Sequence, residues 1–187
     1  MSQFTKKAII QTFLQLLNKQ SMDKITVKDI VETCGINRNT FYYYYKDVYD
    51  LIDDIFKLET ERIISEKNQF ETWTEELSSI VQIAMDNKKA IAHIYYSRSR
   101  DVLEQYLFTM TGIIIRNYVA EHVDTTDVTP ENIEFVCSFF CYSLVGLTLN
   151  WIKGGMQEDS TDVIATEARI FENTIHGAIE SCRTGKK

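Results

Sequence analysis

The sequence of 187 residues contains one proline and seven glycines, so it has few residues that break helices or open tight turns. It also lacks segments in which β-branched and polar residues alternate, which is the pattern of a half-buried strand. Hydrophobic residues make up 44% of the chain, enough for one compact domain or two small ones. We therefore expect an all-α fold of about nine helices joined by short connections.

The four cysteines show no paired spacing, and they are Cys34, Cys137, Cys141 and Cys182. Cys137 and Cys141 are four residues apart, so on a helix they would share one face and could bind a metal or sense oxidants. Because no histidine lies near them in the sequence, two small buried side chains are the preferred interpretation. We expect no metal and no cofactor. The scattered cysteines and the lack of a recognisable signal sequence indicate a cytoplasmic protein.

Enzyme motifs are missing from the sequence. It contains no glycine-rich phosphate loop, no His-Glu-x-x-His motif and no arrangement of serine, histidine and aspartate that indicates a catalytic triad. The three histidines are isolated from one another. We therefore expect that the chain is not an enzyme.

One long segment lacks charge. Residues 135–152, FVCSFFCYSLVGLTLNWI, contain no charged side chain over 18 residues, the minimum length for a membrane span. Polar residues such as Ser138, Tyr142 and Asn150 dilute its apolar character. We interpret it as a helix buried in a core and a subunit interface, and expect no membrane partner.

The formal net charge of -7 argues against a nucleic-acid partner, because lysine and arginine drive phosphate binding. The distribution of charge changes this conclusion. Residues 1–57 carry eight Lys and Arg against seven Asp and Glu, whereas the remaining residues carry twelve against twenty. The first part of the chain can therefore still face a phosphate backbone, while the acidic remainder is repelled by it.

A helix, a glycine turn and a second helix are predicted in this first part. Thr26 and Asp29 fit a capping box at the start of VKDIVETC. Gly35 supplies the left-handed residue of a tight turn, and Asn37 caps a short helix from residue 38 to about 44.

Further helices are predicted on both sides of this pair. The first begins after Thr5, and a fourth begins after Asp47 and continues toward Lys67. Apolar residues at three- and four-residue spacing predict further helices at about 72–86, 88–97, 100–122, 130–153 and 161–182.

The segment NRNTFYYYYK, residues 37–46, places four tyrosines in a row. At about 100° per residue, Phe41 and Tyr45 share the side that faces a core, and three other rows point outward. Polar groups on these rows suit base edges and phosphate oxygens, and in a helix-turn-helix the second helix enters the major groove. The predicted DNA-binding residues are Thr26, Lys28, Arg38, Asn39, Thr40, Tyr42, Tyr43, Tyr44 and Lys46. The alternative is that the tyrosines are partly core and partly ordinary surface residues.

Residues 25–56, ITVKDIVETCGINRNTFYYYYKDVYDLIDDIF, resemble the DNA-binding region of the tetracycline-repressor (TetR) family of bacterial transcriptional regulators. That family has a second helix of the type I-T-V-x-x-I-A and a glycine turn, followed by T-[FL]-Y-x-[HY]-[FY]-x-[DNS]. The chain departs at Val31, where alanine is usual, and at Tyr44 it has the tyrosine that the pattern allows where histidine is common. It matches at Ile25, Thr26, Ile30, Gly35, Ile36, Thr40, Phe41, Tyr42, Tyr44, Tyr45, Lys46, Asp47 and Leu51.

The resemblance implies a three-helix DNA-binding domain at residues 1–47 and a larger helical domain for ligand binding and dimerisation at residues 48–187. It implies a homodimer formed through the helices at about 130–153 and 161–182. The segment FCYSLVGLTLNWIKGGM also resembles the penultimate helix of such regulators.

By the same resemblance, the protein would be a sequence-specific regulator of transcription, a ligand-responsive repressor acting on a palindromic DNA operator. The alternatives are an activator, or a ligand-binding coregulator with the same fold. A small-molecule effector would bind in the larger domain. Any one of the candidate lining residues, taken alone, is more often plain core. They are Trp73, His93, Tyr95, Tyr96, Arg98, Tyr106, Phe139 and Trp151.

Overall fold

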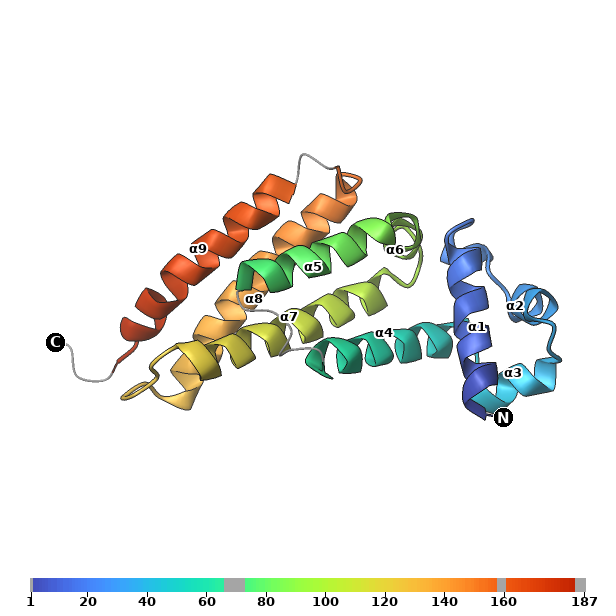
Figure 1. Ribbon diagram of the computed structural model, residues 1–187, viewed down its shortest axis with the longest axis horizontal. Helices are drawn as coiled ribbons and strands as arrows, with labels where there is room; N and C mark the ends of the chain where they lie inside the picture. Colours follow the sequence, from blue (N-terminus) through green and yellow to red (C-terminus); the bar gives the residue numbers. More distant parts are fainter. Residues whose placement is uncertain (1, 66–72, 158–160, 184–187) are drawn as a thin grey trace. The chain divides into compact units, whose positions relative to one another are not determined.

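The computed structural model describes residues 2–65, 73–157 and 161–183, and within these ranges it is all-α, as predicted. Figure 1 shows the arrangement of the helices. They are α1 (Ser2–Leu17), the short 3-10 helix η1 (Met22–Lys24), α2 (Val27–Cys34), α3 (Arg38–Tyr44), α4 (Val48–Ser65), α5 (Trp73–Asp86), α6 (Lys88–Tyr95), α7 (Arg100–His122), α8 (Pro130–Lys153) and α9 (Thr161–Glu180).

Most helix boundaries agree with the sequence pattern to within two residues. The predicted start of the first helix is wrong, because α1 begins at Ser2 and Thr5 lies inside it. The intervening residues are compatible with helix, so the first capping residue did not mark the boundary. The η1 turn was not predicted, since three residues carry no periodic pattern. The fourth helix was expected to continue toward Lys67, which lies outside the described residues; α4 is described to Ser65.

The chain divides into two compact units. The N-terminal unit comprises Met1–Gln69 and Ala84–Leu103, and the C-terminal unit comprises Phe70–Ile83 and Glu104–Lys187. The N-terminal unit therefore contains α4 and α6 in addition to α1, α2 and α3. The functional boundary after residue 47 stays a prediction.

The N-terminal unit has its own hydrophobic core. In it α1 packs against α2 and α6, and α2 packs against α3. Phe13 of α1, Ile30 of α2, Phe41 of α3 and Leu51 of α4 are all completely buried. Full burial of such side chains contributes about 1.5–3 kcal/mol each. This core holds α3 in a fixed orientation relative to the helices around it.

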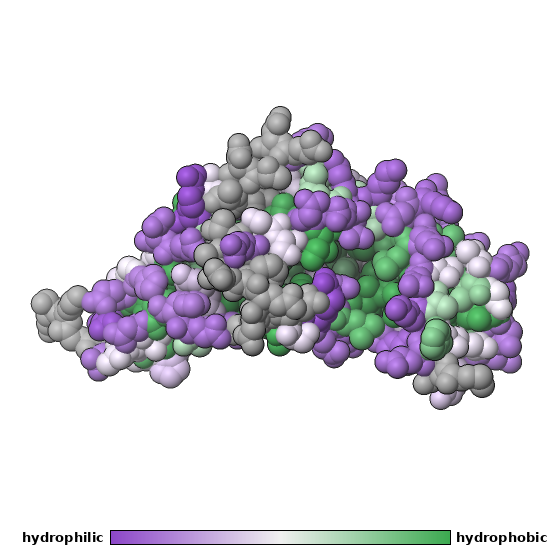
Figure 2. Space-filling view, viewed as in Figure 1, coloured by the Kyte–Doolittle hydropathy of each residue, from purple (hydrophilic) through white to green (hydrophobic). Residues whose placement is uncertain are grey.

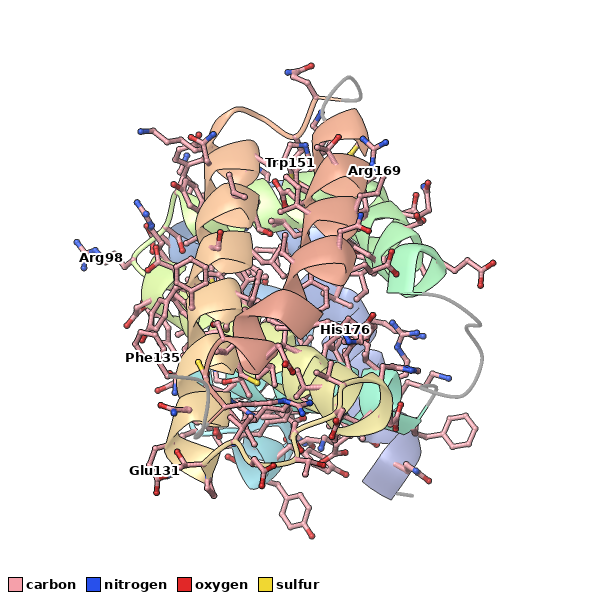
Figure 3. The ribbon with its side chains drawn as sticks, turned by 90° about the vertical axis from the view of Figure 1, so that its left-hand side faces the viewer. Arg98, Glu131, Phe135, Trp151, Arg169 and His176 are labelled. Carbon is pink, nitrogen blue, oxygen red and sulfur yellow. The ribbon has the colours of Figure 1, made fainter. Side chains whose placement is uncertain are left out.

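The core of the C-terminal unit lies between α7, α8 and α9. Figure 3 shows α8 and α9 side by side. Phe140 of α8 and Phe171 of α9 meet edge to face, with ring centroids 5.3 Å apart and ring planes at 89°. The buried residues of this core are Ile115, Val119, Val136, Cys137, Phe140, Cys141, Val145, Ala168, Phe171, Ile175 and Ile179.

Helix α8 is long and apolar enough to cross a membrane by length and composition, with a mean hydropathy of 1.6 over its most apolar window. Only 39% of that window is buried inside the chain, so much of the helix is exposed in a single copy. On the face of the molecule seen in Figure 2, hydrophilic side chains cover much of the surface and apolar residues show between them.

Glu167 of α9 is a half-buried carboxyl group, and burial raises its pKa to about 7 from an ordinary value of 4.5. At pH values between these two pKa values, the folded chain retains a proton that the unfolded chain has released. We predict that the free energy of unfolding falls by about 1–3 kcal/mol as the pH rises through this window to pH 8, and that the Glu167→Gln protein does not show this fall. Denaturant unfolding of both proteins at pH 4 and pH 8, at one chain concentration, measures the effect. Equal pH dependence of the two proteins would contradict the prediction.

Candidate nucleic-acid interface

The turn between α2 and α3 is built around Gly35, which has φ 73° and ψ 28°. This left-handed conformation is easily adopted only by glycine. The backbone N–H groups of Gly35 and Ile36 both donate to the carbonyl oxygen of Val31, the second at 3.1 Å. The predicted glycine turn is thus confirmed, and it fixes the direction in which α3 leaves α2.

Each of the two helices has the N-terminal cap that the sequence predicts. The backbone N–H of Asp29 donates to Thr26 Oγ1 at 3.2 Å, and that of Thr26 donates to Asp29 Oδ2 at 2.9 Å. Hydrogen bonds from the Thr26 side chain and backbone lower the pKa of Asp29, so this cap stays charged at neutral pH. At α3, the backbone N–H of Thr40 donates to Asn37 Oδ1 at 2.8 Å. These caps satisfy helix-end amides that otherwise have no partner.

The predicted sides of α3 are confirmed for the buried row and for two of the three outward rows, whereas the row of Thr40 and Tyr44 is only half-exposed. Phe41 is completely buried and Tyr45 is 3% exposed, whereas Tyr42 is 54% and Tyr43 is 78% exposed. Arg38 and Asn39 are also exposed, and Thr40 and Tyr44 are half-buried. The outward surface of α3 therefore combines a guanidinium, an amide and phenol groups.

The tyrosines of α3 are held by contacts between rings. Tyr43 and Tyr44 meet edge to face, with centroids 5.0 Å apart and planes at 88°. Tyr42 meets the buried Phe41 in the same way, with centroids 5.7 Å apart. Such contacts restrict the side chains, so less conformational entropy is lost when they bind another surface.

The charged residues around α3 have different local roles. Lys28 lies 3.8 Å from Glu32 in an exposed pair, which contributes little to stability. Lys46 is exposed. Asp47 Oδ1 accepts from the backbone N–H of Asp50 at 2.9 Å, and Asp50 Oδ2 accepts from the backbone N–H of Lys46 at 2.9 Å. These two carboxylates therefore cap the start of α4, as was predicted for Asp47.

The sequence did not predict the contacts of Asp54 on α4. Tyr45 Oη donates to Asp54 Oδ2 at 2.9 Å, and Lys6 Nζ of α1 lies 3.0 Å from Asp54 Oδ1 and 2.9 Å from Asp54 Oδ2. Lys6 and Asp54 are 48 residues apart in the chain. No local pattern relates positions so far apart, so only the packing of the helices reveals the contact.

The candidate ligand-lining residues come from both units. His93, Tyr95, Tyr96 and Arg98 belong to the N-terminal unit, and Tyr106, Phe139 and Trp151 belong to the C-terminal unit. The side chain of Trp73 lies outside the described residues.

Several of these candidates have neighbours within their own unit. His93 Nδ1 lies 2.6 Å from the carbonyl oxygen of Leu17 at the end of α1, and the backbone N–H of Arg98 donates to Asp23 Oδ1. Trp151 is buried and its Nε1 donates to the carbonyl oxygen of Gln157 at 3.4 Å. Phe139 is 63% exposed. The set as a ligand site stays a prediction.

Cys137 and Cys141 are buried, as the sequence favours. Burial raises the pKa of both thiols, which reduces their reactivity as thiolates. Within the described part of the chain, no three side chains of histidine, cysteine, aspartate or glutamate are grouped closely enough to hold a metal ion.

Two family models match the chain. Residues 9–55 match the model of the tetR family of bacterial regulatory proteins, and residues 71–174 match a model described as the transcriptional regulator C-terminal region. The first match covers the helices that form the candidate interface.

The individual relatives share only a small part of their sequence with this chain. The HTH-type dhaKLM operon transcriptional activator DhaS of Lactococcus lactis subsp. lactis (strain IL1403) is 21% identical over 176 residues, which cover 90% of this chain and 93% of that protein. The solved structure of a dihydroxyacetone kinase operon activator DhaS has a TM-score of 0.73 at 18% identity, with 96% of this chain and 98% of that chain covered. A TetR transcriptional regulator from Streptococcus agalactiae 2603V has a TM-score of 0.57 at 21% identity, with 89% and 94% covered.

At these identities the similar structures establish the fold, and the family models, one of which spans more than half of the chain, establish the family. The capped helix pair, the glycine turn and the exposed side of α3 are the features of a helix-turn-helix. The chain belongs to the tetR family of bacterial regulatory proteins, which are DNA-binding regulators of transcription.

Proposed function

We propose that the protein binds a palindromic operator in a sequence-specific manner as a homodimer, and acts in the cytoplasm as a ligand-responsive repressor. The observation that carries the DNA-binding part is the exposed side of α3, where Arg38, Asn39, Tyr42 and Tyr43 project from a helix whose opposite side is buried. This is the geometry with which a recognition helix contacts base edges and phosphates in the major groove.

The different side chains on α3 and after it have different expected roles. A lysine that contacts a phosphate adds affinity for every DNA sequence, whereas a side chain that contacts a base edge adds discrimination. We assign Lys46 to the first role and Arg38 and Asn39 to the second.

We predict that Lys46→Ala weakens binding to all duplexes alike and lowers the slope of log affinity against log salt by about one unit. Arg38→Ala or Asn39→Ala should cost about 1–3 kcal/mol and relax the preference at particular base pairs. Both predictions are tested by binding titrations at several salt concentrations. The DNA is a duplex selected in vitro from a random library by the parent protein, together with its single-base variants. If all three substitutions relax discrimination equally, this assignment of roles is wrong.

Support for the homodimer comes from an apolar strip on the outside of α8. Phe135 is 71% exposed, Phe139 is 63% exposed and Tyr142 is 67% exposed, at spacings of four and three residues that place them on one side of the helix. Figure 3 labels Phe135 near one end of α8. Three large rings exposed on one helix are typical of an interface rather than of a free surface.

The neighbouring helix offers a compatible surface. Ile170 of α9 is 56% exposed. Among the described residues, and apart from the adjacent backbone of the same helix, no atom lies within 4 Å of the position a Cβ would occupy at Gly146 of α8 or Gly177 of α9. Such open positions allow helices of a second copy to approach closely. We propose that α8 and α9 of two copies form a four-helix bundle, which explains why α8 is so apolar.

Two copies are also needed for selective binding. A single short helix such as α3 contacts few base pairs, whereas two copies related by a twofold axis contact both halves of a palindrome. Regulation then requires that an effector binds more tightly to one arrangement of the two DNA-binding domains than to another. The candidate lining residues named above, apart from Phe139, which we assign to the dimer interface, are the positions at which to look for such an effector.

Activation is the second candidate outcome, because the relative from Lactococcus lactis is described as an operon activator. Repressor and activator can share every DNA contact and differ in where the operator lies relative to the promoter. Genome-wide recovery of bound fragments, followed by transcript measurement in a deletion strain, distinguishes them. Target transcripts that rise on deletion indicate repression, and transcripts that fall indicate activation.

A further inference from the structure

The carboxylate of Asp54 joins three separate segments of the N-terminal unit. Asp54 lies on α4, Tyr45 follows directly after α3, and Lys6 lies on α1. Both neighbours are within hydrogen-bond distance of the carboxylate, Tyr45 Oη at 2.9 Å and Lys6 Nζ at 3.0 Å. The three side chains Lys6, Tyr45 and Asp54 are called the Asp54 junction below.

The junction is partly shielded from solvent. Tyr45 is 3% exposed, and the side chains of Lys6 and Asp54 are 35% and 26% exposed. A hydrogen bond from a buried hydroxyl to a carboxylate is stronger than one between neutral groups. Burial and the hydrogen bond to Asp54 raise the pKa of Tyr45, so its hydroxyl keeps its proton and remains a donor throughout the physiological range.

Tyr45 is also tied to the recognition helix by its ring. Its centroid lies 5.8 Å from that of Phe41 and 6.4 Å from that of Tyr44, both on α3. The hydroxyl at the other end of the same side chain is held by α4. If α4 shifted relative to α3, the hydrogen bond between Tyr45 and Asp54 would break, or the Tyr45 ring would move against Phe41 and Tyr44. In the second case the orientation of α3 would change.

We propose that Asp54 is a positioning residue for DNA binding, which sets the orientation of α3 relative to α4 and α1 through Tyr45 and Lys6. This inference rests on the proposed DNA-binding function and deepens it. Tyr45 is too buried to contact a duplex. Asp54 carries the same charge sign as phosphate, so direct contact with DNA would be unfavourable.

The sign of the effect separates positioning from direct electrostatics. Removing a negative charge from a DNA-binding surface should by itself strengthen binding. Positioning predicts the opposite, that Asp54→Asn weakens it. Asp53→Asn is the matched control, because Asp53 is the adjacent residue on α4, is exposed, and loses the same charge when substituted.

The experiment measures affinity for a duplex selected in vitro from a random library by the parent protein, and for a scrambled duplex of the same composition. We expect Tyr45→Phe and Asp54→Asn each to weaken binding to the selected duplex by about 10-fold. Binding to the scrambled duplex should change less, so discrimination falls. The slope against salt should not change, since no phosphate contact is lost. The double variant should be no weaker than Asp54→Asn alone, because Tyr45→Phe removes only the hydrogen bond to Asp54, which Asp54→Asn already disrupts together with the Lys6 ion pair.

A purely structural role is recognised by a different readout. Partial unfolding lowers the fraction of protein that can bind but leaves the affinity and discrimination of the folded fraction unchanged, so each titration is corrected for active fraction. Ile55→Val, a change to a buried neighbour on α4, serves as a control that loosens packing without touching the junction.

The inference is overturned if, after this correction, Asp54→Asn and Tyr45→Phe match Asp53→Asn and Ile55→Val in both affinity and discrimination. Failure of the proposed function looks different. In that case the parent protein itself would not prefer its selected duplex over the scrambled one, and the positioning role would fail with it.

Discussion

Phe139→Glu is expected to convert the protein to a monomer and to weaken operator binding by about 100-fold or more. Phe139 is 63% exposed in the single chain and lies in the middle of the apolar strip formed with Phe135 and Tyr142. A carboxylate at the centre of the proposed four-helix bundle would lose its hydration without gaining a partner, which costs several kcal/mol. A monomer binds each half of a palindrome separately, so the gain in affinity from linking two DNA-binding domains in one dimer is lost. Sedimentation measures the first effect, and titration with the selected duplex measures the second.

Ile64→Glu is the control for this prediction. Ile64 is 45% exposed, and it lies on α4, outside α8 and α9 and outside the candidate lining residues. The same kind of substitution at this exposed apolar side chain should leave a dimer with nearly unchanged operator affinity. A dimeric Phe139→Glu protein would show that the strip on α8 is not the interface, and a monomer with full operator affinity would show that dimerisation is not required.

The second large effect concerns two adjacent residues of α3. Phe41 is completely buried, and Phe41→Ala should destabilise the N-terminal unit by about 3–5 kcal/mol through the cavity it leaves. Tyr42 is 54% exposed, so Tyr42→Ala should change stability by no more than about 0.5 kcal/mol and yet reduce operator affinity by about 10-fold. Thermal unfolding and duplex titration of both variants provide the comparison.

This pair separates the two interpretations of the tyrosine-rich segment. If Tyr42→Ala lowers stability as strongly as Phe41→Ala, the outward tyrosines are part of the fold, and the DNA-contact interpretation of this side of α3 fails. Phe41→Leu, which keeps most of the buried volume, should recover most of the stability lost in Phe41→Ala. Recovery would show that the loss arises from packing rather than from the ring itself.

The sequence was sufficient for features that depend on neighbours three or four residues away. The capping box of Thr26 and Asp29 and the cap at Asn37 were predicted and are present. The left-handed Gly35 was predicted from its place after an apolar helix and has φ 73°. Each depends on local backbone geometry, so the residue type nearly determines the conformation.

The sequence was insufficient where composition alone did not indicate the environment of a side chain. Eight aromatic and polar residues were grouped as a candidate ligand site, which stays a prediction. Composition did not distinguish among them the exposed Phe139 from the buried Trp151 of the same helix. The periodic pattern of a helix that is apolar all around does not reveal which side faces its own chain. For α8, only the packing against α7 and α9 separates the buried Phe140 from the exposed Phe139.

The sequence by itself determined the helical class, the positions of most helices, the glycine turn and the outward side of α3, because helix periodicity and capping act over a few neighbouring residues. The tertiary structure alone decided that Asp54 meets Lys6 and Tyr45, and that one side of α8 remains uncovered in a single copy. These features depend on how helices distant in the sequence pack against one another, and no local pattern of residues records that arrangement.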